Sequence, residues 1–521
     1  MKKISILSGI LVLAVAAFSG CAKKEAAPAE AEAAYETVLN VAVTQESPSL
    51  DLHKNSSLIA RQIASGTIWE KLVTLNAASE VVPELAERFE MSGDGTAFTF
   101  YLRQGVKFHD GQIMDADDVT ASMNRWIEGF SVAKEIAGQA RFEKLDDLTV
   151  RIQFDHPAVT FPDVVAGAAQ PASITTRESA ADEDERGFVK EYIGTGPFKF
   201  AEWKLSQYIL LEKFADYVPY GDPSKPIDGW AGYKAPKVEQ IYFYLVPQSS
   251  TRMAGLETGQ FHVDYNVVDE TLSRLSSLND IEIVRYQAGT LAYVFNKKQG
   301  VGKNLYFRQA VNAAAHDDDI LRATYGSLYD LGSSYMDDTQ PYWKSEAGSQ
   351  NYNNKDPEKA KALLQQAGYN GEPFRILVAN LNNMDRGALV LEQHLKAVGI
   401  NVELIVVDWA TLTQYRTDPS RFDLYVTSFA SVPVPSLKLY FGPSYPGWSE
   451  DETLQRYFAD FNGATNREEA RKRWDILQGY SWEYLPLINV GHYIAAFAWS
   501  KKVENVTVYN GVYFWNTSVK K

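Results

Sequence analysis

The chain of 521 residues is long enough for about three domains and can bury several cores without a disulfide. Its 45% hydrophobic and 22% charged residues exclude a polytopic membrane protein, a collagen and a wholly disordered chain. The formal net charge of −15 leaves no basic stripe of the kind that holds nucleic acid, so we expect no nucleic-acid partner.

The first 20 residues have the three parts of a secretory signal: Lys2 and Lys3, an apolar run over 4–18, and small residues directly before Cys21. Phe18-Ser19-Gly20-Cys21 resembles a bacterial lipobox, with Phe where Leu is usual; a plain signal peptide with an incidental cysteine is the alternative. We expect residues 1–20 to be a lipoprotein signal peptide, Cys21 to be lipidated, and the low-complexity residues 21–35 to form a tether to the membrane.

The body of the chain alternates strand and helix patterns. Strands are expected over 38–43, 98–102 and 149–154, and a helix over 115–126 with Asp115 as its N-cap.

The clearest pattern predicts a strand over 374–379, a helix over 386–398 ended by Gly399, and a second strand over 401–407. This spacing is typical of a βαβ unit with a parallel strand pair.

Motifs for catalysis are absent from the sequence. It contains no phosphate-binding loop, no dinucleotide fingerprint, no H-E-x-x-H and no G-x-S-x-G. The seven histidines are scattered. The acidic run His316-Asp317-Asp318-Asp319 has metal-ligating residue types, but acids are also favoured in the first turn of a helix, which is the interpretation we prefer. We therefore expect no catalytic residue, no metal site and no cofactor.

A group of short motifs between residues 83 and 119 resembles the signature of family 5 extracellular solute-binding proteins, the dipeptide, oligopeptide and nickel receptors of bacterial ABC importers. The segments that carry this resemblance, in the family's order, are 83–87, 92–95, 98–111, 115–119, 194–198, 308–310 and 356–360. The resemblance implies an α/β fold: a large, two-lobed periplasmic-binding-protein clamshell of type II character with an extra subdomain, built of mixed sheets flanked by helices.

The resemblance also implies how the chain is divided and what it does. Residues 36–290 are expected to form an outer lobe with an inserted subdomain at about 77–185, residues 291–490 a second lobe, and residues 491–521 a return to the outer lobe. The implied protein is a monomeric, extracytoplasmic or periplasmic lipoprotein. It captures a small solute of the peptide class and delivers it to a permease with ATPase subunits.

Other functions remain open on the same scaffold. The solute can be an oligosaccharide, an opine or a metal chelate, and the scaffold can instead serve a ligand sensor or an enzyme. A hydrolase would need a nucleophile–base pair, which no motif supplies.

By similarity, the loops that follow the core strands face the ligand. The residues expected to bind it are His53, Asn55, Gly289, Thr290, Asn380, Asn382, Asn383, Arg386, Ser428, Phe429, Ser431 and His492. Phe429 stands where the family often has Trp, with core packing as the alternative. Arg386 can clamp a carboxylate or be a surface residue at a helix start, and the asparagines can form only a turn.

One departure from the family pattern concerns the ligand's amino group. The peptide receptors hold the α-amine with an Asp shortly after that aromatic residue, whereas residues 424–449 contain no acid. A buried ammonium without a counter-ion is costly, so free dipeptides are expected to bind weakly unless an acid from elsewhere in the chain replaces the missing one.

Overall fold

The computed structural model describes residues 35–55, 57–168 and 170–521. The predicted signal peptide, Cys21 and all but the last residue of the predicted tether lie outside these ranges. Within the ranges, none of the helices combines the length and the apolar character that a membrane crossing requires.

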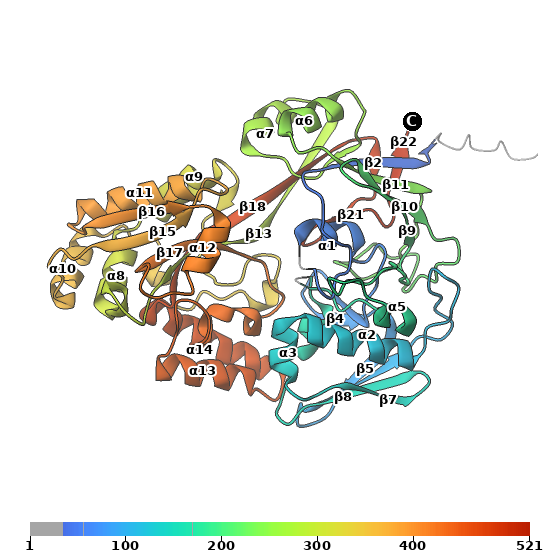
Figure 1. The fold of residues 1–521 in the computed structure, drawn as a ribbon, viewed down its shortest axis with the longest axis horizontal. Helices are drawn as coiled ribbons and strands as arrows, with labels where there is room; N and C mark the ends of the chain where they lie inside the picture. Colours follow the sequence, from blue (N-terminus) through green and yellow to red (C-terminus); the bar gives the residue numbers. More distant parts are fainter. Residues whose placement is uncertain (1–34, 56, 169) are drawn as a thin grey trace, which may run out of the picture.

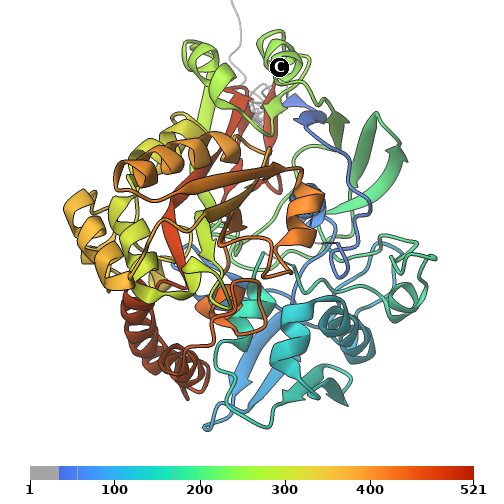
Figure 2. The ribbon, with the colours of Figure 1, turned by 60° about the vertical axis from the view of Figure 1, so that its left-hand side comes forward.

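One 11-stranded mixed sheet runs through both lobes of the molecule (Figure 1). Its strands follow the order β16-β15-β17-β13-β18-β12-β2-β11-β10-β9, with β14 (Tyr329–Asp330) beside β18. The long strands β13 (Ile281–Phe295) and β18 (Leu487–Ser500) are antiparallel neighbours, and they pass from one lobe to the other (Figures 1 and 2). The other strands of this sheet are β2 (Val38–Val43), β9 (Phe198–Lys204), β10 (Tyr208–Lys213), β11 (Gln240–Leu245), β12 (Val263–Asp264), β15 (Phe374–Ala379), β16 (Val402–Val407) and β17 (Leu424–Ala430).

The first lobe contains the strands from β12 to β9 and carries a subdomain with its own four-stranded antiparallel sheet. The strands of that sheet, in spatial order, are β5 (Ala86–Met91), β6 (Ala97–Leu102), β8 (Thr149–Gln153) and β7 (Phe142–Asp146). Short strands complete the lobe: β1 (Tyr35–Glu36), β3 (Val73–Leu75), β4 (Val81–Pro83), β19 (Val503–Glu504), β20 (Thr507–Val508), β21 (Val512–Tyr513) and β22 (Ser518–Lys520). Its helices are α1 (Leu58–Ala64), α2 (Ala116–Gly129), α3 (Ser131–Ala137), α4 (Phe161–Ala166), α5 (Arg177–Ala181), α6 (Ser249–Glu257) and α7 (Asp269–Ser276).

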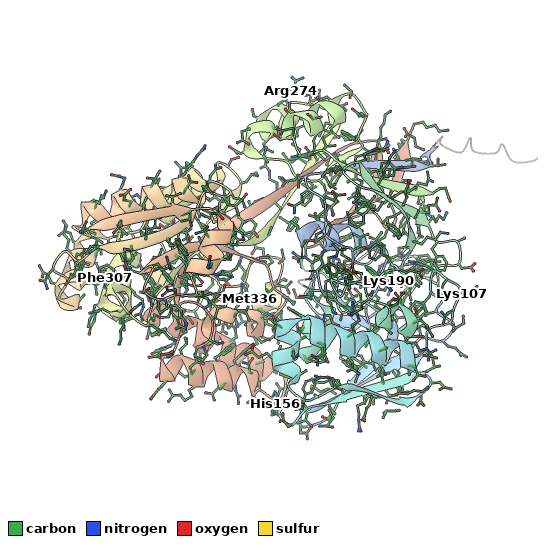
Figure 3. The ribbon with its side chains drawn as sticks, in the orientation of Figure 1. Lys107, His156, Lys190, Arg274, Phe307 and Met336 are labelled. Carbon is green, nitrogen blue, oxygen red and sulfur yellow. The ribbon has the colours of Figure 1, made fainter. Side chains whose placement is uncertain are left out.

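The second lobe packs helices around β15, β16 and β17. These helices are α8 (Leu305–Ala314), α9 (Asp317–Tyr325), α10 (Pro357–Ala367), α11 (Met384–Ala397), α12 (Trp409–Tyr415), α13 (Glu452–Asn462) and α14 (Arg467–Tyr484). Figure 3 places Phe307 and Met336 in this lobe and Lys107, His156 and Lys190 in the other. The architecture is the α/β clamshell expected from the sequence.

Local sequence signals placed several elements correctly. The Asp115 side chain accepts hydrogen bonds from the backbone N–H groups of Asp117 and Asp118, at 2.9 and 3.1 Å, and so caps α2 as predicted. Strands β15 and β16 are parallel with α11 between them, which confirms the predicted βαβ unit. The acidic run after His316 forms the first turn of α9, as the helix interpretation predicted.

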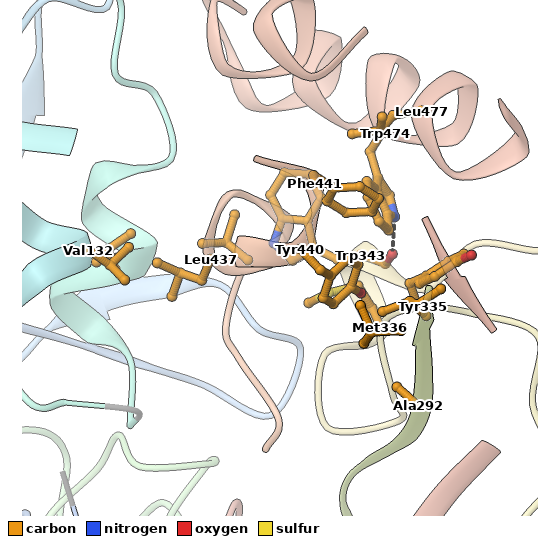
Figure 4. Close-up of a cluster of buried hydrophobic side chains, with 14 of the residues drawn as sticks. Val132, Ala292, Tyr335, Met336, Trp343, Leu437, Tyr440, Phe441, Trp474 and Leu477 are labelled. Atoms are coloured by element: carbon orange, nitrogen blue, oxygen red, sulfur yellow. Dashed lines mark hydrogen bonds between the residues drawn. The ribbon is translucent and has the colours of Figure 1, made fainter. Parts of the chain in front are cut away.

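Apolar packing joins the subdomain to the second lobe. Val132 of α3 and Leu437 belong to one buried cluster, which continues into the aromatic core around Trp343 and Trp474 (Figure 4). The indole N–H of Trp474 donates to the Trp343 carbonyl at 2.7 Å. Gly167 lies against Pro433, where a Cβ would come within 2.6 Å of the proline ring. The two lobes are therefore in direct contact beside the sheet.

Candidate functional site

A cavity of about 740 Å³ lies beside β13 and β18 and is lined from both lobes. The first lobe contributes residues from α1 and from 265–270, and the second lobe contributes 322–326 together with Asn382, Asn383 and Arg386. Ser428 and residues 430–433, at the end of β17 and just after it, form another wall. A concave site of this size between two lobes suits a small solute.

Five of the twelve residues predicted to bind ligand line this cavity: Asn382, Asn383, Arg386, Ser428 and Ser431. The first three lie at the start of α11, where Asn382 and Asn383 adopt positive φ angles of 52° and 56°. Arg386 is exposed on the cavity side of this turn. A role for these residues in ligand binding remains a prediction.

His53 and Asn55, which were expected to bind ligand, do not line this cavity. The loop that carries them turns into the first lobe, where Asp51 forms a buried ion pair with Arg125 at 2.7 Å. The His53 Nε2 lies 2.7 Å from the Ser173 carbonyl, and the Asn55 amide donates to the Ser47 hydroxyl at 2.9 Å. Burial lowers the pKa of His53 to about 4, so its ring is neutral at pH 7.

Gly289, Thr290 and His492 lie within the sheet and do not line the cavity either. The Thr290 hydroxyl is 3.3 Å from the His492 Nδ1, and both side chains are buried. Tyr493, the next residue after His492, lines the cavity instead, because successive side chains of a strand point to opposite faces. A role for Gly289, Thr290 and His492 in ligand binding stays a prediction.

Asn380 and Phe429 are also outside the set of lining residues. Asn380 is exposed and bonds through its backbone N–H to the Val407 carbonyl at 2.9 Å. The Phe429 ring packs against Tyr440, with ring centroids 5.1 Å apart, and against Tyr445. These contacts agree with core packing, which was the alternative to a role of Phe429 in the wall of the ligand site.

The sequence-based prediction did not include three residues that line the cavity: Arg61, Tyr286 and Tyr493. Tyr286 and Tyr493 occur in strands whose register the sequence does not reveal. A signal existed for Arg61, because it is the only charged residue in the segment 58–64, which forms the mostly buried helix α1.

An acid from elsewhere in the chain stands behind the acid-free wall. The Ser431 hydroxyl donates to the buried carboxylate of Asp337, which also accepts the Thr339 backbone N–H at 3.1 Å. Burial lowers the pKa of nearby Lys438 to about 8, and the negative charge of Asp337 acts against that shift. Asp337 is therefore already engaged by two residues and balanced by a buried cation.

A group of metal-ligating type lies outside the cavity. His316, Asp319 and His394 bring their ligand atoms within 4.8 Å of one another, with the His316 Nδ1 at 3.4 Å and the His394 Nε2 at 3.8 Å from the Asp319 carboxylate. The sequence placed His316 and Asp319 in one acidic run, but it did not reveal His394, because α11 supplies that residue from a distant segment.

The family model described as "Bacterial extracellular solute-binding proteins, family 5 Middle" matches residues 80–448. Among curated proteins, the chain is 25% identical over 480 residues to "Probable peptide ABC transporter periplasmic-binding protein y4tO" of Sinorhizobium fredii, covering 86% of this chain and 87% of that protein. It is 26% identical over 552 residues to "Heme-binding protein A" of Haemophilus influenzae, covering 96% and 95%.

Solved structures of the same fold cover nearly the whole chain. AgaA from A. tumefaciens R10, in complex with agropinic acid, matches with a TM-score of 0.73 at 24% identity, covering 93% of this chain and 99% of that one. The substrate-binding protein CtaP of Listeria monocytogenes matches with a TM-score of 0.79 at 18% identity, covering 94% and 100%. At these identities the structural matches establish the fold alone.

The position of His53 generates a prediction about pH. Its pKa of about 4 in the folded protein lies below the ordinary value of 6.5, so the unfolded state binds the proton more readily. The stability that neutral His53 contributes is complete above pH 6.5 and is lost as the pH falls towards 4, by roughly 3 kcal/mol.

The variant His53→Gln, whose amide can still donate to Ser173, is therefore expected to lose less stability between pH 7 and pH 4 than the wild type. Urea unfolding at a series of pH values measures the difference. His156→Gln, at an exposed site in the subdomain (Figure 3), is the control and should follow the wild type. Identical curves for His53→Gln and the wild type would mean that this histidine is not held neutral by burial.

Proposed function

Because the chain belongs to family 5 of the bacterial extracellular solute-binding proteins, we propose that it is the substrate-binding protein of an ABC importer and holds a small solute in the cavity beside β13 and β18. The observation that carries the proposal is that both lobes line this one cavity. Its partners would be a membrane permease and the ATPase subunits of the importer.

The proposal includes the predicted division of the chain: an outer lobe of residues 36–290 with an inserted subdomain at about 77–185, a second lobe of 291–490, and a return of 491–521 to the outer lobe. Contacts between the lobes support a clamshell in its closed form. Arg467 of α14 pairs with the buried Asp163 of α4 at 2.9 Å, and the hydroxyls of Thr160 and Ser436 are 3.4 Å apart. Opening would break these contacts and expose the solute.

A binding role is preferred to catalysis because of what lines the cavity. Among the residues that the structure describes, the lining contains neither histidine nor cysteine. General acid–base and nucleophilic catalysis depend most often on these residue types.

The names of the relatives and the hydrogen bonds of Asp337 both bear on the chemical class of the solute. Curated relatives are named for peptides, glutathione and heme, and structural neighbours hold agropinic acid or Met-Leu. A peptide-like solute is the first candidate. The second is a solute without a free amine, such as an opine or another non-peptide, and it is favoured by the engagement of Asp337 with Ser431 and Thr339.

The cavity assignment is tested by filling the cavity. Ala288 lines it, and Ala288→Trp would occupy the space that a solute needs. Bound solute at about 100 times its dissociation constant should stabilise the wild type by roughly 2.7 kcal/mol and make it more compact in small-angle scattering.

Thermal shifts with glutathione, Met-Leu, agropinic acid and the ligand released from native protein measure the effect of Ala288→Trp. This variant should lose the stabilisation, whereas Ala459→Trp, at an exposed site on α13, should keep it. Equal stabilisation of the wild type and Ala288→Trp would place the solute elsewhere.

Free dipeptides are expected to bind weakly or not at all. Ser428 and Ser431 offer only neutral hydrogen bonds, about half as strong as charge-assisted ones, and the charge of Asp337 is already balanced. Calorimetry with Met-Leu and N-acetyl-Met-Leu should give at least equal affinity for the acetylated form. Submicromolar binding of Met-Leu that both acetylation and Asp337→Asn abolish would identify Asp337 as a replacement amine site and refute this expectation.

We further propose that the protein is extracytoplasmic and that two or more acyl chains on Cys21 hold it at the membrane, since one chain binds only marginally. Cys21→Ser should yield released protein or an unprocessed precursor, detected by membrane fractionation and by mass spectrometry of the N-terminus. Ala27→Ser, in the predicted tether, should remain anchored. Normal maturation with undiminished membrane retention of Cys21→Ser would contradict lipidation at this residue.

A further inference from the structure

Arg61 is a cation on the cavity wall that the rest of the protein leaves largely without partners. It projects from α1 and lines the cavity. One Nη1 hydrogen bond, of 3.0 Å, reaches the Ala168 carbonyl, while its Nε is buried without a hydrogen-bond partner in the described part of the chain. No described carboxylate forms an ion pair with it.

Other buried guanidinium groups of this protein are satisfied in ways that Arg61 is not. Arg252 pairs with Asp264 at 2.7 Å, and Arg125 with Asp51 at 2.7 Å. Arg308 pairs with no acid in the described ranges, but it donates to the carbonyls of Gly302, Lys303 and Tyr484. A desolvated cation with one hydrogen bond is costly, and burial lowers the pKa of Arg61 accordingly.

The surroundings of Arg61 resemble one side of a ligand site. Tyr286 of β13 and Tyr493 of β18 line the same cavity as Arg61. Gln340 and Asn510 also line it, and each has a buried side-chain oxygen with no partner among the described residues. A ligand with an acidic group for Arg61 and with hydrogen-bond donors for these oxygens would satisfy all three.

The charged residues that line the cavity also favour an acidic ligand. Three arginines and two carboxylates line the cavity of a protein whose net charge is −15. Arg322 is paired with Asp318, and the Asp269 carboxylate accepts the backbone N–H and hydroxyl of Ser327, at 3.0 and 2.7 Å. Arg61 is the lining cation that is both partly buried and unpaired, whereas Arg386 is exposed.

We propose that Arg61 binds an oxyanion of the transported solute, a carboxylate or a phosphate, and that the phenols of Tyr286 and Tyr493 flank it. This inference rests on the proposed function, and it narrows the solute to an acidic compound. Guanidinium groups match both oxyanions through paired N–H donors, so the position favours Arg over Lys.

The test uses three probes: N-acetyl-Met-Leu with a carboxylate, N-acetyl-Met-Leu amide with none, and N-acetyl-O-phosphoserine amide with a phosphate. Calorimetry should show one of the two anionic probes binding the wild type about 10- to 100-fold more tightly than the neutral amide. Which one binds distinguishes carboxylate from phosphate. The ligand released from native protein should carry an anionic group in mass spectrometry.

Arg61→Gln should bind the anionic probe no better than the neutral one, and Arg61→Lys should recover part of the difference. Because Arg61→Gln removes a buried charge, it should melt at or above the temperature of the ligand-free wild type, which separates lost binding from lost folding. Arg274→Gln is the matched control and should bind as the wild type does, because this exposed arginine of α7 (Figure 3) pairs with Glu257 and does not line the cavity.

Equal binding of anionic and neutral probes, undiminished binding by Arg61→Gln, or a released ligand without an acidic group would each overturn the inference and leave the transport function standing. A wild type that binds no probe and releases no ligand, or whose binding survives Ala288→Trp, contradicts the proposed function itself.

Discussion

The antiparallel pairing of β13 with β18 is the constraint on which the site depends. Residues 281–294 of one strand pair with 487–500 of the other along almost their whole length, and the register shifts between Gln287 and Gly289 and again between Leu291 and Ala292. These irregularities fall where the sheet passes from one lobe to the other, and β-bulges bend and twist a strand. Tyr286, Ala288 and Tyr493 line the cavity beside the first of them.

Close packing at this crossing explains why glycine is found there. A Cβ on Gly289 would lie 2.1 Å from the Phe429 carbonyl oxygen and 2.6 Å from the Tyr493 ring, and Gly491 has a φ of +145°. Both positions need a residue without a side chain, one for space and the other also for its backbone conformation. The crossing strands thus hold the wall of the cavity close to the neighbouring strand β17.

Signals that act over short distances were readable from the sequence, and those that depend on register were not. The cap of α2 and the βαβ unit from β15 to β16 follow from residues near one another in the chain. Tyr493 lines the cavity where His492 was expected, because a shift of one residue moves a side chain to the other face of a sheet. The burial of His53 in the first lobe was not readable from the sequence, because the ion pair of Asp51 with Arg125 beside it joins residues 74 positions apart.

Two cations near the cavity, Lys438 and Arg61, differ in how their charges are balanced, and that difference bears on closure. Lys438 and Asp337 carry opposite charges within the second lobe, so the charge of Lys438 is balanced without a ligand. Arg61 belongs to the first lobe and finds no anion in the described part of either lobe. A closed state that desolvates an unpaired cation is disfavoured when empty, and an acidic solute removes that penalty only when the cleft is shut. Such a differential contact is what allows a ligand to shift the equilibrium towards closure.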